Sequence, residues 1–273
     1  MPEQDTFLGW EKPGKALITG ASAGIGSCFA RQLAQKGFDL VLLARRGDRL
    51  QSLADKLEAE CGIRCEILST DLSEPDEIRK TADRIKQIDN LDILVNNAGF
   101  GTIGYFTEVP IEKTMRMFHL HMTACVLLTH AALQGMLKRK RGAIINVASV
   151  AAFFLSPGNV MYNTTKNFIK TFSENIRLEI SDADIRIQAL CPGLTQTEFH
   201  EVGDFEKFDK SVIPSLLWMS ADKVASISLK ALGKNRKVVV IPGWKNHVFA
   251  WILRHNSMIQ WIARKNMKKR SRP

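Results

Sequence analysis

The sequence predicts one doubly wound α/β domain, with a central parallel sheet of about seven strands and helices on both faces. Short β-branched or leucine-rich runs alternate with segments whose apolar residues recur at helical spacing. No internal repeat, low-complexity linker or hinge divides the 273 residues, a length at which an α/β fold often forms one domain. We expect residues 1–243 to form this domain and residues 244–273 to form a basic, amphipathic extension.

Seven runs have the pattern of buried strands. They are Lys15–Thr19, Asp39–Ala44, Arg64–Ser69, Leu91–Asn96, Ala143–Ala148, Ile185–Leu190 and Lys237–Ile241. Two long helices are expected at Ile111–Lys138 and Asn159–Ile180. The stretch Met117–Leu137 lacks Asp, Glu, Lys and Arg, but its histidines, His121 among them, would be costly inside a bilayer. A helix packed inside the protein or against another subunit fits it better.

The formal net charge of +10 comes from the end of the chain. Residues 223–273 carry 13 Lys+Arg and no Asp or Glu, which leaves 25 Lys+Arg against 28 Asp+Glu in the remainder. A nucleic-acid-binding body is therefore not indicated. The five scattered cysteines show no metal-ligand spacing, and we expect reduced thiols and no metal. Residues 1–15 do not resemble a signal peptide, so we expect a cytoplasmic protein.

A glycine-rich turn, Thr19–Gly26, follows the first strand and opens a helix near Ile25. Gly20, Gly24 and Gly26 allow a sharp turn and a close approach of phosphate, while the helix N-terminus offers N–H groups and a positive dipole end. The spacing is Gly-x-x-x-Gly-x-Gly, with Ser22 inside the turn. The turn predicts binding of a dinucleotide pyrophosphate.

The end of the second strand indicates which dinucleotide binds. Arg45 and Arg46 stand where an NAD-binding protein usually has an acidic residue, and guanidinium groups suit a 2′-phosphate. A solvated arginine pair is the alternative. The location favours NADP(H). At later strand ends, Asp71-Leu72 is expected near the adenine, and Asn97, Ala98 and Gly99 are expected to line the nicotinamide side.

Tyr162 and Lys166 are one helical turn apart, so their side chains share a face. An ammonium group beside a phenol stabilises the phenolate and would bring its pKa of about 10 toward the neutral range. Ser149, at the end of the fifth strand, is placed to hold a carbonyl oxygen. A tyrosine and a lysine at this spacing are usually just two surface residues. Together with Ser149 and the glycine turn, they predict hydride transfer in which Tyr162 acts as the acid–base group.

These motifs resemble those of the short-chain dehydrogenase/reductase family, over about Lys15 to Ile241. The resemblance rests on Thr19–Gly26, Asn96–Gly99, Ser149, Tyr162/Lys166 and Pro192-Gly193. It implies a Rossmann domain and hydride transfer between nicotinamide and a substrate carbonyl carbon. It further implies that Lys166 binds the nicotinamide ribose, and that Pro192, Gly193 and Thr195 surround the carboxamide.

One position departs from the family pattern. His121 aligns with an asparagine that the family often uses to join the lysine to a water-borne proton path. A histidine can relay protons, so His121 is a candidate catalytic residue; a packed core histidine is the alternative.

Apolar residues are concentrated around the expected substrate side. They are Phe153, Phe154, Leu155, Phe199, Phe205, Phe208, Leu216, Leu217 and Trp218. They favour a hydrophobic carbonyl or alcohol substrate, although core packing accounts for some of them.

In the extension, Val248, Trp251, Ile252, His255, Ile259 and Ile262 fall at helical spacing among basic residues. This segment suits an anionic membrane surface, a neighbouring subunit or a cap over the pocket. It is loosely similar to the branch of 3-oxoacyl-CoA reductases and 17β-hydroxysteroid dehydrogenases.

The sequence thus predicts an NADPH-dependent carbonyl reductase, or the reverse alcohol dehydrogenase, acting as a homodimer or homotetramer. The alternative is a catalytically silent NADP(H)-binding regulator or scaffold at a membrane surface. Its weakness is the presence of Ser149, Tyr162 and Lys166, which a pure sensor does not need.

Overall fold

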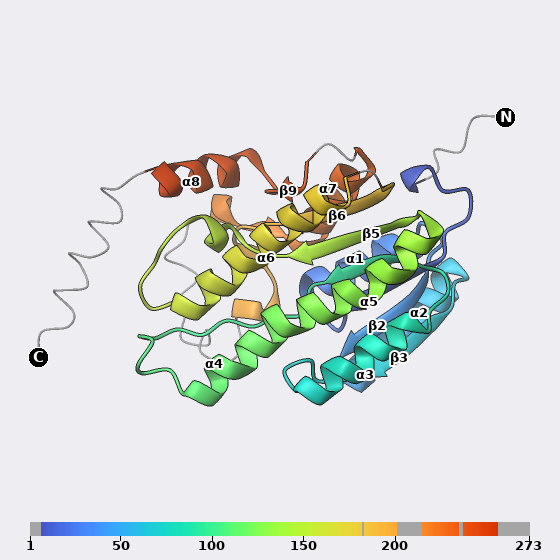
Figure 1. Ribbon diagram of the computed structural model, residues 1–273, viewed down its shortest axis with the longest axis horizontal. Coiled ribbons are helices and arrows are strands. Elements are labelled where there is room, and N and C mark those ends of the chain that lie inside the picture. The colour runs from blue at the N-terminus through green and yellow to red at the C-terminus, as the bar shows by residue number, and fades with distance from the viewer. Residues whose placement is uncertain (1–6, 182, 201–214, 235–236, 256–273) are drawn as a thin grey trace, which may run out of the picture.

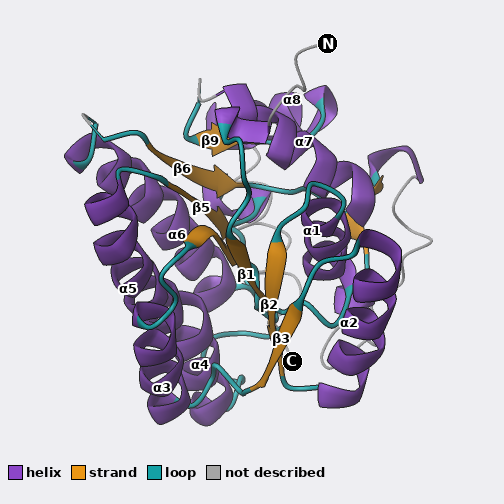
Figure 2. Cartoon of the chain, turned by 90° about the vertical axis from the view of Figure 1, so that its right-hand side faces the viewer, coloured by secondary structure: helices purple, strands orange, loops and turns teal. Residues whose placement is uncertain are grey.

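The computed structural model describes residues 7–181, 183–200, 215–234 and 237–255. A seven-stranded parallel sheet runs through the molecule with helices on both faces, as the sequence predicts (Figures 1 and 2). The strands, in chain order, are β1 (Lys15–Thr19), β2 (Asp39–Ala44), β3 (Cys65–Ser69), β4 (Leu91–Asn96), β5 (Gly142–Val147), β6 (Ile185–Leu190) and β9 (Val239–Val240). Each predicted strand is present within one or two residues of its expected bounds.

The order of strands in the sheet is β3-β2-β1-β4-β5-β6-β9. From β1 the chain first adds β2 and β3 on one side. It then crosses back and adds β4, β5, β6 and β9 on the other side of β1. Between β1 and β4 the order reverses, and a crevice opens there at the carboxyl ends of the strands, where open α/β sheets bind ligands. A second sheet pairs β7 (Thr195–Gln196) with β8 (Met219–Ser220) beyond this edge.

Figure 2 shows α3, α4, α5 and α6 on one side of the sheet and α1 and α2 on the other. The helices are α1 (Gly24–Ala34), α2 (Gly47–Cys61), α3 (Pro75–Lys86), α4 (Ile111–Phe118), α5 (Ala124–Arg139), α6 (Val160–Glu179), α7 (Ala221–Lys234) and α8 (Trp244–His255). Short turns of other helix types are η2 (His119–Thr123, a π-helix), η3 (Val150–Phe153), η4 (Glu198–His200) and η7 (Ser215–Leu217).

Alternate residues of each strand supply the two halves of the core. Ile18 and Leu42 pack under α1, α2 and α7, whereas Leu17 and Val41 pack under α3 and α5. All four side chains are fully buried. Strands covered on both faces must be apolar throughout, which explains their continuous leucine and isoleucine runs.

Helices α4 and α5 join through the π-helical turn η2 into one helical stretch, Ile111–Arg139. Within the described part of the chain, this stretch alone has the length and the mean hydropathy, 1.3, of a membrane-crossing helix. However, 44% of its apolar 18-residue segment is buried inside the protein. Helix α5 packs on α3 and on the sheet. This packing agrees with the prediction, based on the histidines of this segment, that the helix lies inside the protein.

Candidate active site at the carboxyl edge of the sheet

The glycine turn between β1 and α1 has backbone that only glycine adopts easily. Gly20 and Gly24 have φ angles of 66° and 56°, in the left-handed region. A Cβ on Gly26 would overlap the carbonyl oxygen of Gly20, so α1 begins in direct contact with the preceding turn. No side chain caps the N-terminus of α1 at Ala23. The turn therefore offers open backbone and a positive helix end, the features that pyrophosphate binding needs.

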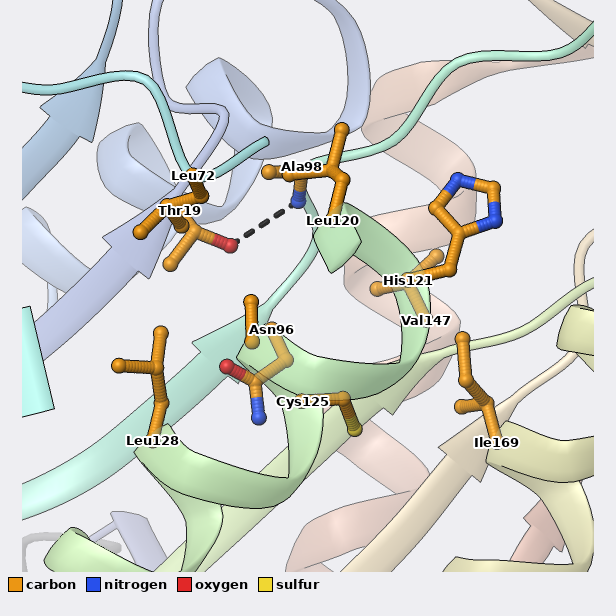
Figure 3. A pocket seen from close by; sticks show the side chains of 11 residues that line it. Thr19, Leu72, Asn96, Ala98, Leu120, His121, Cys125, Leu128, Val147 and Ile169 are labelled. Carbon is orange, nitrogen blue, oxygen red and sulfur yellow. Dashed lines mark hydrogen bonds between the residues drawn. The ribbon is translucent and has the colours of Figure 1, made fainter. Parts of the chain in front are cut away.

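Thr19, the last residue of β1, fixes this turn to the end of β4. Its hydroxyl accepts the backbone N–H groups of Asn97 and Ala98, each at 2.9 Å, and the bond to Ala98 is drawn in Figure 3. The Asn97 side-chain amide donates back to the carbonyl oxygens of Thr19, at 2.9 Å, and Gly20, at 3.3 Å. The Asn97 side chain thus braces the glycine turn, and its role toward nicotinamide stays a prediction.

Ser149, Tyr162 and Lys166 meet where β5 ends and α6 passes over it. The Ser149 side chain hydrogen-bonds the Tyr162 hydroxyl and also accepts the Ala151 backbone N–H at 3.1 Å, which caps η3. One turn along α6, the Lys166 Nζ donates to the carbonyl oxygen of Val147 at 2.9 Å. The three side chains that the sequence singles out therefore form one cluster.

The direction of the Tyr162 pKa differs from the sequence-based expectation. Burial raises it above its usual value of about 10, and the hydrogen bond from Ser149 only partly opposes this. Lys166 does not lower it, because its ammonium points to Val147 and lies 5.8 Å from the centre of the phenol ring. The expected tuning of Tyr162 by Lys166 is wrong for this structure. Tyr162 is a neutral phenol at neutral pH.

His121 lies in the π-helical turn η2 and is fully buried beside this cluster. Its Nε2 accepts the Phe100 N–H at 3.3 Å, and its Nδ1 lies 2.9 Å from the Thr165 hydroxyl, which donates to the Tyr162 carbonyl at 3.0 Å. This network assigns the proton to Nδ1. Burial, and next the charge of Lys166, lower the pKa of His121 well below its usual value.

The neutral ring of His121 therefore ties the loop after β4 to the helix that carries Tyr162. Both ring nitrogens are engaged in this arrangement, so a proton relay would require one of these bonds to break. The relay stays a prediction. A small pocket adjoins the ring, below the carboxyl ends of β1, β4 and β5, and Figure 3 shows its lining side chains. The labelled residues are Thr19, Leu72, Asn96, Ala98, Leu120, His121, Cys125, Leu128, Val147 and Ile169.

Arg46, at the start of α2, reaches toward the glycine turn. Its guanidinium donates to the Ser22 hydroxyl at 3.1 and 3.3 Å and to the Glu198 carboxylate at 2.8 Å. Arg49 binds the other oxygen of Glu198 at 2.6 Å. These bonds, from Arg46 first and then Arg49, lower the pKa of Glu198. A carboxylate thus lies beside the cationic group that the sequence assigns to a 2′-phosphate.

Arg45 is more exposed than Arg46 and lies 3.9 Å from Asp71. Asp71 accepts the N–H and hydroxyl of Ser73 at 2.9 and 2.7 Å and a bond from Arg116 at 2.9 Å. Although burial alone would raise the Asp71 pKa, the bonds from Ser73 and the two arginines lower it. Asp71 therefore fixes the turn after β3, and the neighbouring Leu72 is buried in the core. An adenine contact by either residue stays a prediction.

Pro192 and Gly193 follow β6 on the other side of the crevice. The Pro192 carbonyl accepts the Val150 N–H at 2.9 Å, which joins this segment to the turn after Ser149. The hydroxyl of Thr195 is bonded to the Gly193 carbonyl at 3.0 Å, and Thr195 is buried. The Asn246 side chain of α8 lies so close to Gly193 that a Cβ there would overlap it. Helix α8 thus packs directly on this strand end.

Of the apolar residues expected around the substrate, Phe199 is nearest to the chemistry. Its ring centre lies 6.1 Å from that of Tyr162. Leu155 is 73% exposed, whereas Phe153 packs partly into the core. Phe205, Phe208 and the side chain of Leu216 lie outside the described residues, as do Ile259 and Ile262 and the side chains of Ile252 and His255 in the expected C-terminal stripe.

A doubly wound sheet, a glycine turn at its switch point and a Ser–Tyr–Lys cluster on neighbouring elements together define a nicotinamide-dependent oxidoreductase. Comparison with known proteins gives the family: the chain belongs to the short chain dehydrogenases, whose family model matches residues 14–204. The fold that the sequence resemblance implied is thus the fold of the family to which the chain belongs, and the catalytic roles of Ser149, Tyr162 and Lys166 stay predictions.

Individual relatives agree with this assignment. The chain is 33% identical to a short chain dehydrogenase of Pseudocercospora fijiensis over 71% of its length and 63% of the relative. It is 30% identical to the very-long-chain 3-oxoacyl-CoA reductase of Anas platyrhynchos, over 71% of its length and 64% of that protein. The match thus spans under two thirds of either relative. A short-chain dehydrogenase from Sphingobium yanoikuyae, solved with NADPH, has a TM-score of 0.79 and 32% identity, and the match covers 94% of this chain and 93% of that one.

Sequence reasoning missed the residues that hold the site together. Thr19 opens the motif Thr19–Gly26 but was given no role of its own, although its hydroxyl bonds backbone 78 residues away. No motif marks Thr165, whose hydroxyl bonds the Tyr162 carbonyl on the same helix. Glu198 and Arg49 were missed because their pairing joins segments 149 residues apart. Only for Thr19 was a signal available, since a threonine directly before a glycine turn at a strand end can bond the neighbouring strand.

We predict that Lys166→Met stabilises the protein at neutral pH while it impairs the site. Burial lowers the Lys166 pKa from 10.5 to about 8, which corresponds to about 3 kcal/mol against the charged form. Loss of the bond to Val147 offsets about 1 kcal/mol. The free energy of unfolding should therefore rise by about 2 kcal/mol, measured by denaturant titration.

This gain should shrink as pH rises from about 8 to 10.5, because folded Lys166 loses its proton before unfolded Lys166 does. Lys230→Met, on the exposed face of α7, serves as the matched control and should change stability little. A pH-independent gain, or destabilisation of Lys166→Met at neutral pH, would contradict the unfavourable burial of this charge.

Proposed function

We propose that the protein reduces the carbonyl group of an apolar substrate with NADPH, or catalyses the reverse oxidation. The observation that carries this proposal is the meeting of Ser149, Tyr162 and Lys166 beside the crevice at the carboxyl edge of the sheet. Ser149 follows β5, whereas Tyr162 and Lys166 lie on α6. Proton transfer to a carbonyl oxygen requires these side chains to lie close together. The NADPH complex of the Sphingobium relative supports the choice of cofactor.

The residues at the crevice fit a phosphorylated dinucleotide. Gly20 and Gly24 give the turn its left-handed backbone, and the N-terminus of α1, which no side chain caps, offers its dipole to the pyrophosphate. Arg46, held by Ser22, supplies the cation for a 2′-phosphate. When bound, the nicotinamide supplies the hydride that adds to the substrate carbonyl carbon. The protein has to orient the carbonyl group and provide a proton to its oxygen.

Tyr162 has the protonation state that reduction needs. Its raised pKa keeps it a neutral phenol, so it donates its proton to the oxygen as the C–O double bond becomes single. Ser149 holds the same oxygen through its hydroxyl. The phenolate left behind is stabilised by Ser149, and a proton from solvent restores the phenol.

The surroundings of Tyr162 favour a hydrophobic substrate. Phe199 packs against Tyr162, and exposed apolar side chains continue outward along both loops that border the site. They include Ile103, Phe106, Leu155 and Val160. The similarity to a very-long-chain 3-oxoacyl-CoA reductase supports a substrate with an apolar chain.

We also propose a cytoplasmic homodimer or homotetramer, formed through the long helices α4–α5 and α6. Ile111 and Met115 on α4 and Leu178 on α6 are exposed apolar residues on these helices. Burying such side chains between subunits would stabilise an oligomer.

Tyr162→Phe should lower kcat by about 10²- to 10⁴-fold, because it removes the proton donor and little else. The dissociation constant of NADPH, measured by fluorescence titration, should stay close to the wild-type value. A panel of apolar ketones, aldehydes and 3-oxoacyl thioesters, followed by NADPH absorbance, supplies the substrate. Tyr105→Phe is the matched control, since Tyr105 is the second of the two tyrosines and lies on an exposed loop. Wild-type turnover by Tyr162→Phe would refute the acid role.

Arg46→Ala should weaken NADPH binding by about tenfold to a hundredfold, because it removes a charge-assisted bond to the 2′-phosphate. NADH carries a 2′-hydroxyl, so its affinity should change little. Isothermal titration with both cofactors measures the difference. Arg64→Ala is the control, as Arg64 is an exposed arginine that pairs with Asp39 at the start of β2. Equal losses for NADPH and NADH would exclude phosphate recognition by Arg46.

Glu198→Gln should tighten NADPH binding by about threefold to tenfold, since a 2′-phosphate competes with the Glu198 carboxylate for Arg46 and Arg49. The affinity for NADH should not change. The same titration, repeated at high salt, should show a smaller difference between wild type and variant. Weaker NADPH binding by Glu198→Gln would mean that Glu198 closes the crevice rather than competing for it.

A further inference from the structure

Three large apolar side chains of helix α8 point away from the protein. Trp244, Val248 and Trp251 occupy one helical face and are 71%, 46% and 65% exposed. The opposite face holds the helix in place: Ala250 is buried, and Asn246 lies against Gly193 and donates to the Pro242 carbonyl at 2.7 Å. The outward direction of the tryptophans is thus set by the inward packing of small and polar residues.

An ordinary surface helix exposes polar residues, whereas this face of α8 exposes two tryptophans and a valine. Scattered exposed apolar residues are common, but two tryptophans and a valine on one face form a continuous apolar surface. Tryptophan combines a large apolar ring with an N–H donor, and it is favoured where one side of a surface is apolar and the other wet.

Basic residues border this face and follow it. Lys245 and Arg254 occupy helix positions on its two flanks, and the Lys245 Nζ lies 5.7 Å from the centre of the Trp244 ring. Residues 223–273 contain 13 Lys+Arg and no Asp or Glu. An apolar helix face with basic flanks complements a surface that is apolar inside and negatively charged outside.

We propose that the outward face of α8, formed by Trp244, Val248 and Trp251, binds the surface of an anionic lipid membrane. A second copy of this chain is a poorer occupant. A symmetric contact through α8 would bring two strongly basic segments together, and their charges would repel. Lipid headgroups carry the opposite charge, and each basic residue near them strengthens binding.

Docking through α8 would also place the active site at the membrane surface. Helix α8 packs on η3, which follows Ser149, and Figure 1 shows α8 at the same end of the molecule as the tip of β5 and the start of α6. Leu155, directly after η3, is 73% exposed. An apolar substrate could then enter from the membrane without crossing water. The membrane contact itself does not depend on the proposed reaction, and its test needs no turnover.

The test is co-sedimentation of the full chain with lipid vesicles. Wild-type protein should bind vesicles containing phosphatidylserine, with a blue shift of its tryptophan fluorescence, and should bind pure phosphatidylcholine vesicles at least about tenfold more weakly. Trp244→Ser/Trp251→Ser should lose binding to the anionic vesicles by at least about tenfold. Its melting temperature and its NADPH affinity should match those of wild type, because both side chains point outward.

Leu137→Ser is the matched control. It removes an exposed apolar residue near the carboxyl end of α5, away from α8, and should bind vesicles like wild type. Three results would overturn the proposal. Wild type could fail to bind anionic vesicles, or the tryptophan variant could bind as well as wild type, which would assign binding to basic residues alone. Alternatively, the tryptophan variant could change the oligomeric mass in sedimentation velocity without a change in vesicle binding, which would make this face a subunit interface.

Discussion

The bond from the Lys166 ammonium to the Val147 carbonyl is the interaction on which the site depends. It fixes α6 over the last residue of β5, and this position brings Tyr162 to Ser149. A buried ammonium with one neutral acceptor is poorly solvated, and its pKa falls to about 8 as a result. The fold thus holds a charge at an unfavourable position. We explain this placement by function, since the family resemblance assigns Lys166 to binding of the nicotinamide ribose.

A buried polar network keeps this position from relaxing. Asn96 of β4 donates to Thr129 of α5 at 3.0 Å and to Asn146 of β5 at 2.8 Å. Asn146 in turn donates to Ser173 of α6 at 3.0 Å. Each link crosses from one element to another, and Thr129, Asn146 and Ser173 are fully buried. Such satisfied networks favour one arrangement of the elements, since any shift would leave buried polar groups without partners. The positions of β4, β5 and α6 are thereby fixed below the site.

The strands and the reactive cluster were predictable from sequence, whereas the electrostatics were not. Period and composition place all seven strands because strands buried on both faces must be apolar, and the spacing of Tyr162 and Lys166 fixes them on one helical face. The direction of the Tyr162 pKa shift was predicted wrongly, because burial and not Lys166 determines it. Proximity along a helix does not reveal that the ammonium points to a strand-end carbonyl, nor that burial dominates the phenol's pKa. Likewise, the partner of Arg46 could not be found, because Glu198 lies on a distant segment.

The two ends of the crevice use charge in opposite ways. Near Arg46 the side chain of Glu198 is 40% exposed, so its pairing costs little to break. Near Lys166 the charge is buried, and no anionic side chain is bonded to it among the described residues. An internal carboxylate there would bind the ammonium, hold it away from Tyr162 and stabilise the resting state. A neutral carbonyl acceptor leaves most of the field of the ammonium unscreened. We expect that field to act when negative charge develops on a bound oxygen, which is the condition for preferring a transition state over a ground state.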